Sequence, residues 1–222
     1  MSFKSSICVL VSGGLDSDVL LAEMGTRFHG VWPVYVRQGL AWELVELYWL
    51  RKFIKALPPF EKGGIQPLTV LSLPMADVYG RHWSTGNGSV PGSRSKDQAV
   101  YLPGRNLTLS LKAAVFGSKK GVSTLALGSL GGNPFPDATP GFLKAWSHAL
   151  TLGLKHPLRV VAPYRTFSKA DVIRRGRAWP LQLSFSCIAP RGRTHCGRCN
   201  KCAERRKAFR AAGVEDKTVY AN

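Results

Sequence analysis

The chain is 222 residues long and 45% hydrophobic, which suits one sizeable α/β domain with a small appendage and excludes two full domains. The first apolar run, residues 7–11, is far shorter than the roughly 20 residues that span a bilayer or the core of a signal peptide, so we expect a cytoplasmic protein without a membrane partner. Lysine and arginine number 31 against 13 acidic residues, and the net charge of +18 favours phosphate-bearing partners. Because the basic residues are spread along the chain, nucleic acid is a possible partner but not the favoured one.

A strand, a glycine turn and a helix follow one another near the start of the chain. Residues 7–11 read as a buried strand, residues 12–17 (Ser-Gly-Gly-Leu-Asp-Ser) as a loop, and the apolar spacing from Val19 to Met24 as a helix. The glycines expose backbone N–H groups and the positive end of the helix faces the loop, so this segment is suited to binding a phosphate chain. It lacks the lysine of a Walker loop, which argues against a P-loop kinase or GTPase. The residues assigned to nucleotide binding are Val11, Ser12, Gly13, Gly14, Leu15, Asp16 and Ser17.

Strand and helix patterns alternate through the rest of the chain. Further strands are expected at 30–36, 68–73, 123–127 and 158–162, and helices at 42–55, 107–115 and 142–152. Another helix is expected after Ser168, with Asp171 in a capping-box position, whereas residues 75–98 show no period and predict a long loop over the site. This alternation predicts a five-stranded, doubly wound parallel sheet of Rossmann-like type, an α/β fold in which ligands bind beyond the carboxyl ends of the strands.

The helix expected at 42–55 is rich in apolar and aromatic residues. Its apolar face is predicted to contain Leu44, Leu47 and Tyr48 among others. We expect Trp42, Tyr48 and Trp49 to be exposed, which makes a homodimer possible.

Four of the five cysteines lie close together near the C-terminus. In a cytosolic protein this spacing indicates a metal rather than disulfides, and four thiolates suit a closed tetrahedral structural Zn²⁺ site. An iron–sulfur cluster with four cysteine ligands is the alternative that spacing alone leaves open, and His195 is expected beside the site rather than in it. We expect residues 181–222 to form a helical zinc-binding subdomain and residues 1–180 an α/β domain that binds the phosphate chain of its ligand. The predicted metal ligands are Cys187, Cys196, Cys199 and Cys202.

Five short motifs together resemble the QueC family, the 7-cyano-7-deazaguanine synthases of the PP-loop ATP pyrophosphatase superfamily. The motifs are S-G-G-x-D-S at 12–17, Y-x-P-x-R-N at 101–106, Pro136-Asp137, S-K-A-D at 168–171, and the cysteine motif at 186–202. The resemblance covers nearly the whole chain and implies a sheet of the adenine nucleotide α-hydrolase type.

The resemblance also implies a reaction. ATP would activate the carboxylate of 7-carboxy-7-deazaguanine, ammonia would convert the adenylate to an amide, and a second ATP would activate the amide for dehydration to the nitrile. Asp16 would hold Mg²⁺, while Lys169 and Arg105 would stabilise the transferring phosphate. The residues expected to contact the substrate are Arg105, Asn106, Asn133, Asp137 and Phe185.

The chain departs from the family pattern at residues 37–42 and 133–139, both within the inferred substrate region. Two alternatives therefore stand beside the nitrile synthase: a QueC-like ligase that uses another acid or acceptor, and a PP-loop tRNA-modifying enzyme.

Overall fold

The computed structural model describes residues 6–61 and 63–221, and it contains the predicted parallel sheet. All strand pairs in it are parallel, and their order is β3-β2-β1-β4-β5. The order reverses at β1, whose last residue Leu10 pairs with Val34 on one side and Leu127 on the other. The carboxyl ends of β1 and β4 therefore form the switch point at which such sheets bind ligands. The strands are β1 (Ser6–Leu10), β2 (Gly30–Arg37), β3 (Thr69–Ser72), β4 (Thr124–Leu127) and β5 (Arg159–Val161).

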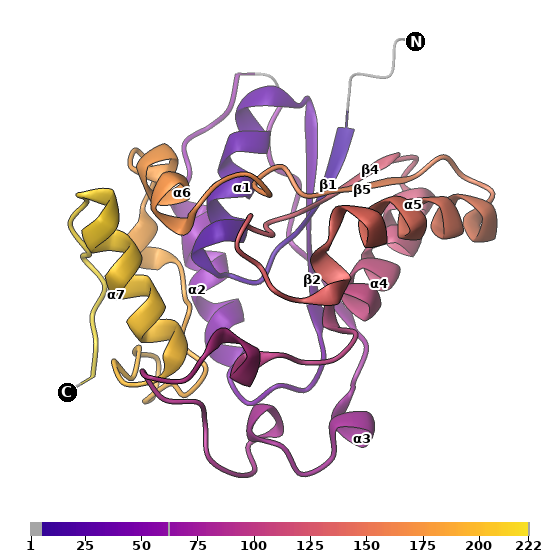
Figure 1. Ribbon diagram of the computed structural model, residues 1–222. Helices are drawn as coiled ribbons and strands as arrows, with labels where there is room; N and C mark the ends of the chain where they lie inside the picture. Colours follow the sequence, from indigo (N-terminus) through magenta and orange to yellow (C-terminus); the bar gives the residue numbers. More distant parts are fainter. Residues whose placement is uncertain (1–5, 62, 222) are drawn as a thin grey trace.

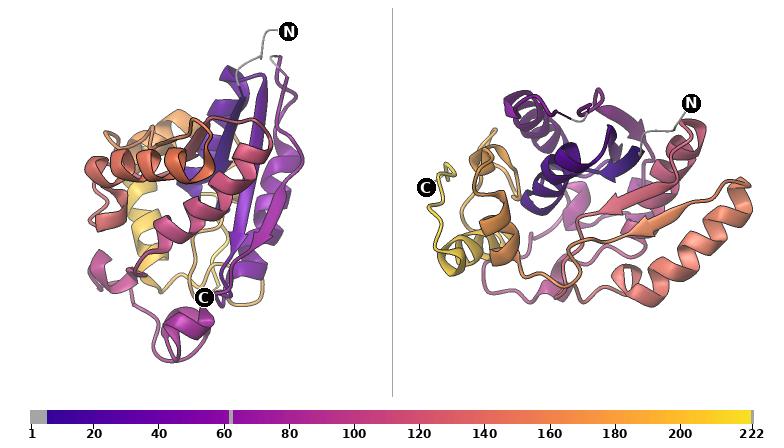
Figure 2. Two further views of the ribbon diagram at one scale, coloured as in Figure 1. Left: turned by 90° about the vertical axis from the view of Figure 1, so that its right-hand side faces the viewer. Right: turned by 90° about the horizontal axis from the view of Figure 1, so that it is seen from above.

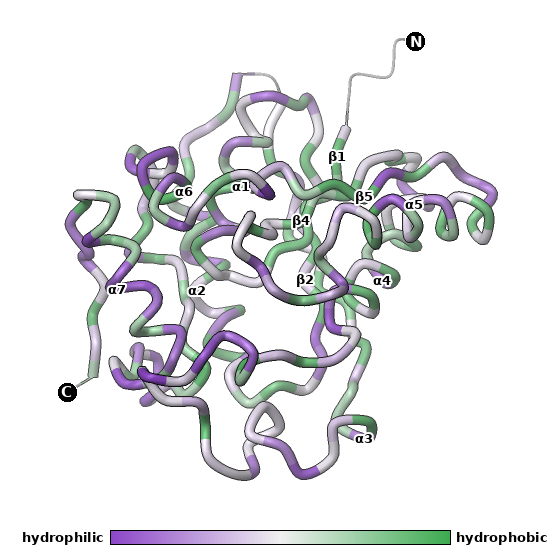
Figure 3. Tube along the Cα trace, in the orientation of Figure 1, coloured by the Kyte–Doolittle hydropathy of each residue, from purple (hydrophilic) through white to green (hydrophobic). Residues whose placement is uncertain are grey.

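Helices cover both faces of the sheet (Figures 1 and 2). On one face lie α1 (Leu15–Arg27), α2 (Glu43–Ala56), α6 (Lys169–Gly176) and α7 (Asn200–Ala212). The other face is covered by α4 (Arg105–Lys119) and α5 (Pro140–Leu154). Each face has its own hydrophobic cluster, and Figure 3 shows the hydrophobic residues concentrated on the central strands. The doubly wound arrangement predicted from the alternating pattern is therefore confirmed.

The segment predicted as a long loop contains short helical turns. These are α3 (Ala76–Tyr79) and two 3₁₀ turns, Trp83–Thr85 and Asp97–Val100. The first 3₁₀ turn is capped by the His82 side chain, and the Trp83 ring stacks on Trp42 at a centroid distance of 5.5 Å. The contact between Trp42 and Trp83 joins side chains far apart in sequence, so no periodic pattern could indicate it.

The buried face of α2 differs from the prediction. Trp42 is 2% exposed rather than a surface residue, and Leu44, assigned to the apolar face, is 71% exposed. The prediction was wrong because two acidic residues, Glu43 and Glu46, occupy buried positions of the helix where hydrophobic residues were expected. Of the aromatic residues proposed for a dimer surface, only Tyr48 and Trp49 remain partly exposed.

The C-terminal segment returns to the start of the fold. The Phe185 N–H donates to the Gly13 carbonyl at 2.6 Å, and the buried Arg205 of α7 donates to the Leu181 carbonyl and the Ser184 hydroxyl. This segment carries the cysteine cluster, and it packs directly on the glycine loop after β1. Residues 1–5, 62 and 222 of the two expected domains lie outside the described residues, and the boundary at 180/181 stays a prediction. None of the helices in the described ranges is long and apolar enough to cross a membrane.

Candidate functional site

A cavity of about 300 Å³ opens at the carboxyl ends of β1 and β4. It brings together all but one of the residues that the sequence assigned to the nucleotide and the substrate. The exception is Gly13, which adopts a φ of +71° and packs behind the loop, where an added Cβ would lie 2.9 Å from the Glu46 carbonyl oxygen. The assigned residues that line the cavity are Val11, Ser12, Gly14, Leu15, Asp16, Ser17, Arg105, Asn106, Asn133, Asp137, Lys169 and Phe185.

The glycine loop is held in shape by its own serines. The Ser17 hydroxyl accepts from the Ser12 N–H at 3.1 Å and donates to the Gly14 carbonyl at 3.0 Å. Gly128, which follows β4, approaches so closely that a Cβ there would lie 3.0 Å from the Ser17 nitrogen. A glycine at this position therefore leaves the N-terminus of α1 uncovered, which is where an anion binds best.

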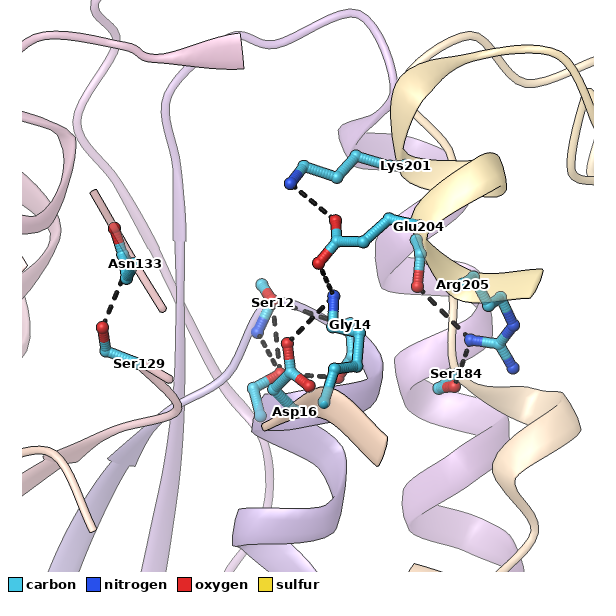
Figure 4. A network of polar contacts seen from close by, with 12 residues as sticks. Ser12, Gly14, Asp16, Ser129, Asn133, Ser184, Lys201, Glu204 and Arg205 are labelled. Carbon is cyan, nitrogen blue, oxygen red and sulfur yellow. Dashed lines mark hydrogen bonds and ion pairs between the residues drawn. The ribbon is translucent and has the colours of Figure 1, made fainter. Parts of the chain in front are cut away.

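A chain of alternating charges runs beside the loop (Figure 4). Lys169 Nζ lies 3.3 Å from Asp16 Oδ2 and 2.6 Å from Glu204 Oε1, and Lys201 Nζ lies 2.7 Å from Glu204 Oε2. Burial lowers the pKa of Lys169, but Asp16 and Glu204 more than offset this and raise it. Both lysines hold the pKa of Glu204 at about 2 despite its burial.

Asp16 is less well compensated than Glu204. Burial raises its pKa, and Lys169 offsets this only in part. Among the described residues, Asp16 Oδ1 finds no hydrogen-bond donor. The carboxylate thus has the position and the free oxygen to accept a further cation.

On the α2 side, the cavity is lined by a different set of polar groups. Glu46 accepts hydrogen bonds from the Tyr35 hydroxyl at 2.7 Å and from Trp42 Nε1 at 3.0 Å. Burial raises the pKa of Glu46 to about 7, although the Arg105 guanidinium and the Tyr35 hydroxyl act in the opposite direction. Glu43 lines the cavity as well, and it accepts from the Gln38 N–H in the loop after β2. Arg105 is therefore close enough to Glu46 to act on its charge.

A second glycine loop follows β4 and begins at Gly128; it makes contacts with α4 and within itself. Asp137 accepts from the Asn106 N–H at 2.8 Å and from Asn106 Nδ2 at 3.1 Å, which places a negative charge at the N-terminus of α4. Asn133 donates to the Ser129 hydroxyl and accepts from the Phe135 N–H. Both side chains border the cavity while stabilising the loop.

Phe185 is fully buried and lines the cavity. Its ring contacts His195 at a centroid distance of 4.5 Å. His195 is itself buried and accepts from the Ser186 N–H, so it lies beside the cysteine cluster rather than on the surface.

The four predicted cysteines form a buried cluster. Their sulfur atoms all lie within 4.8 Å of one another, with Cys187 and Cys199 separated by 3.9 Å and Cys196 and Cys202 by 4.0 Å. Four sulfurs bound tetrahedrally about 2.3 Å from a zinc ion lie about 3.8 Å apart. Backbone N–H groups also point at the sulfurs, including that of Cys199 at Cys196 Sγ, and they would stabilise thiolates. The donor set and its spacing fit a metal such as zinc.

Sequence reasoning missed several residues that line the cavity or support it, namely Tyr35, Glu46, Lys201 and Glu204. Only the acidic residues within the apolar pattern of α2 gave a signal, because a carboxylate on a helix face that must be buried requires partners. Lys201 and Glu204 gave none, since their position depends on the C-terminal segment folding back onto the loop.

These features define a class: a doubly wound α/β protein with a glycine loop at its switch point and, packed against that loop, a four-cysteine cluster that could hold a metal. Residues 6–213 match the family model described as queuosine biosynthesis protein QueC. The chain belongs to this family.

Two curated relatives match almost end to end. A 7-cyano-7-deazaguanine synthase from Methanothermobacter thermautotrophicus is 30% identical over 95% of this chain and 97% of its own length. The synthase of the same name from Anaeromyxobacter dehalogenans is 31% identical over 96% of this chain and 94% of its own length. Among solved structures, a predicted tRNA methyltransferase subunit from Methanocaldococcus jannaschii aligns over 98% of this chain and 93% of its own, but its TM-score of 0.44 and identity of 14% are too low to inform function.

Proposed function

We propose that the chain is a 7-cyano-7-deazaguanine synthase that uses ATP to convert 7-carboxy-7-deazaguanine and ammonia to the nitrile. The observation that carries the proposal is the cavity itself, in which an uncovered glycine loop, the Asp16–Lys169 pair and the residues assigned to the substrate converge. Family membership and the names of the full-length relatives support the same reaction.

The glycine loop is suited to hold the phosphates of ATP. Backbone N–H groups in the first turn of α1, at Leu15 and Asp16, would bind them. Lys169 would neutralise the charge that develops when a carboxylate oxygen attacks the α-phosphate and pyrophosphate leaves. The unpartnered Oδ1 of Asp16 fits Mg²⁺, which prefers carboxylate oxygens and supplies charge neutralisation at phosphates. Lys169 also holds Asp16 in place for that task.

Ammonia then displaces AMP from the acyl adenylate to give an amide. In the second cycle the amide oxygen attacks the α-phosphate of another ATP and pyrophosphate leaves; the C–O bond then breaks, the oxygen departs on AMP, and loss of the two N–H protons leaves the nitrile. Both cycles need the same phosphate contacts, so one cavity can serve both. Arg105 lines the same cavity with an Nε that finds no acceptor among the described residues, so it is available to the substrate as well as to the transferring phosphate.

The cysteine cluster is proposed to hold a structural Zn²⁺. Four thiolates leave no open position for a water or substrate, so the metal would stabilise the fold and take no part in the chemistry. Asn106, Asn133, Asp137 and Phe185 are proposed to shape the substrate side of the cavity.

The test is to incubate the purified protein with ATP, Mg²⁺, ammonia and 7-carboxy-7-deazaguanine and to follow the base and nucleotide products by mass spectrometry. We expect the nitrile, with the amide as an intermediate and pyrophosphate released from ATP. Turnover of ATP with another acid and none with this one would instead assign the chain to a ligase of different specificity. Absence of nucleotide turnover with either would refute the proposal.

A further inference from the structure

Glu46 is a buried carboxylate that the nucleotide chemistry does not use. It is 8% exposed and lines the cavity from α2. Within the described part of the chain, the donors that contact its two oxygens are the Tyr35 hydroxyl and the Trp42 indole N–H, which are both neutral. The side chain is thus held in one orientation, but no cation contacts it directly.

Glu23 is a second buried glutamate, and the bonds that it makes are those of a residue with a structural role. Glu23 of α1 also accepts from a tyrosine hydroxyl, that of Tyr164 at 2.9 Å. Its other oxygen accepts from Arg175 Nε at 2.7 Å, so its charge is paired, and it lies outside the cavity. Glu46 lacks such a cation and faces the cavity, which is the arrangement expected of a group that is completed by a ligand.

The unused hydrogen-bonding capacity around Glu46 has a definite pattern. A carboxylate offers about four acceptor positions, and Tyr35 and Trp42 take one on each oxygen, so each oxygen keeps another. Arg105 lines the same cavity, acts on Glu46 electrostatically, and its Nε finds no acceptor among the residues described. The cavity therefore presents two acceptor positions next to a donor.

We propose that Glu46 and Arg105 form the subsite that recognises the guanine edge of the acid substrate, with the carboxylate accepting from N1–H and the 2-amino group and the guanidinium donating to O6. This inference rests on the proposed function. The edge of guanine presents one acceptor followed by two donors, which matches a guanidinium beside a carboxylate. Adenine presents one amino group beside a ring acceptor, so the adenine of ATP does not match this pair.

The assignment also orients the reacting group. The carboxyl group of the substrate is attached at C7 of the five-membered ring, beside O6 and far from the 2-amino group. Binding of the guanine edge at Glu46 keeps the two negative charges apart and leaves the carboxyl free to face the glycine loop and Lys169 in the same cavity. The other buried carboxylates that line this side of the cavity, Asp137 and Glu43, are already engaged. Asp137 accepts at the N-terminus of α4, and Glu43 accepts from the Gln38 N–H and lies 3.6 Å from Arg37 Nε.

The test compares 7-carboxy-7-deazaguanine with its analogue that lacks the 2-amino group, using wild type and Glu46→Gln. Both KM and kcat are measured from pyrophosphate release, and direct binding of each compound is measured by calorimetry without ATP. Wild type is expected to prefer the 2-amino compound by roughly 10- to 100-fold, the discrimination typical of a bidentate contact to a base edge. In E46Q this preference should collapse through KM, with kcat and the KM for ATP little changed, because the lost contact is the same in ground and transition states.

Two further variants complete the design. Glu23→Gln removes a buried glutamate of similar surroundings outside the cavity, so it controls for general damage and should keep the wild-type preference. Arg105→Met should raise KM for both compounds equally, since both carry O6.

Three results would overturn the inference: an unchanged preference in E46Q, a rise in the KM for ATP in place of the acid, or an R105M effect confined to kcat. Failure of the proposed function would be distinct, because wild type would then neither bind nor turn over either compound.

Discussion

Replacing Glu46 by glutamine should make the protein more stable at pH 8, because an unpaired buried carboxylate is costly to fold. Its pKa rises from the ordinary 4.5 to about 7. At about 1.4 kcal/mol for each tenfold change in proton affinity, ionising Glu46 in the folded state costs roughly 3 kcal/mol. Below pH 4.5 the residue is protonated in both states and nothing is lost, so this cost develops as pH rises from 4.5 to 7 and stays constant above.

Glutamine removes that cost, but it also removes one hydrogen-bond acceptor. Its oxygen can still accept from Trp42 Nε1, while its amide must donate to the Tyr35 hydroxyl, whose own proton then loses its acceptor at a cost of about 1 kcal/mol. E46Q should therefore exceed wild type by about 2 kcal/mol at pH 8 and fall below it by about 1 kcal/mol near pH 4.5.

Urea unfolding of both proteins across this pH range measures the difference. The groups that act on the charge of Glu46 are Tyr35, Glu43, Arg105 and the buried Asp18, and all are present in both proteins, so their own titration cancels to first order. A stability difference that does not change with pH would refute the reasoning, and so would E46Q being the less stable protein at pH 8.

Two further predictions concern the charges at the loop and the metal. Lys169→Met should lower kcat by roughly 10²- to 10³-fold, the usual effect of removing one group that stabilises transition-state charge. The control, Arg174→Met, replaces an exposed residue of the same helix and should leave the rate unchanged. Equal rates for the two variants would contradict the role of Lys169 beside Asp16. Metal analysis should find about one zinc per chain, and the Cys199→Ser variant should lose the zinc and melt roughly 10 °C lower than wild type. Iron in place of zinc would overturn the assignment. An unshifted melting temperature would show that the site does not stabilise the fold.

What the sequence predicted well depends on neighbouring residues. The strand, glycine loop and helix from 7 to 24 follow from local spacing, and the capping box of Ser168 and Asp171 is present as predicted. The cysteine cluster could be predicted equally well, because Cys196, Cys199 and Cys202 lie close together in the sequence, just before and at the start of α7. Signals of this kind need no knowledge of how distant segments meet.

What the sequence could not predict depends on contacts between distant segments. Trp42 is buried because Trp83, in a segment without period, stacks on it, and Glu46 is tolerated on the inner face of α2 because Tyr35 reaches it from β2. A helical pattern scores an acidic residue as solvent-facing, so by itself it does not place Glu46 on the buried face of α2. Of the two residues that we infer to recognise the guanine edge, Arg105 was therefore assigned from its motif, whereas Glu46 was not.

The cysteine cluster and the glycine loop are connected through the C-terminal segment, so the proposed structural metal would have an indirect effect on activity. Cys199 caps α7, and the first turns of this helix carry Lys201 and Glu204 to the charge chain at Lys169. Phe185, two residues before Cys187, donates its N–H to the Gly13 carbonyl. Loosening the cluster therefore releases both the helix that supports Lys169 and a contact that holds the loop. A weakened metal site should lower turnover under conditions in which the sheet is still folded, because the phosphate contacts are held from both sides by the segment that the metal fixes.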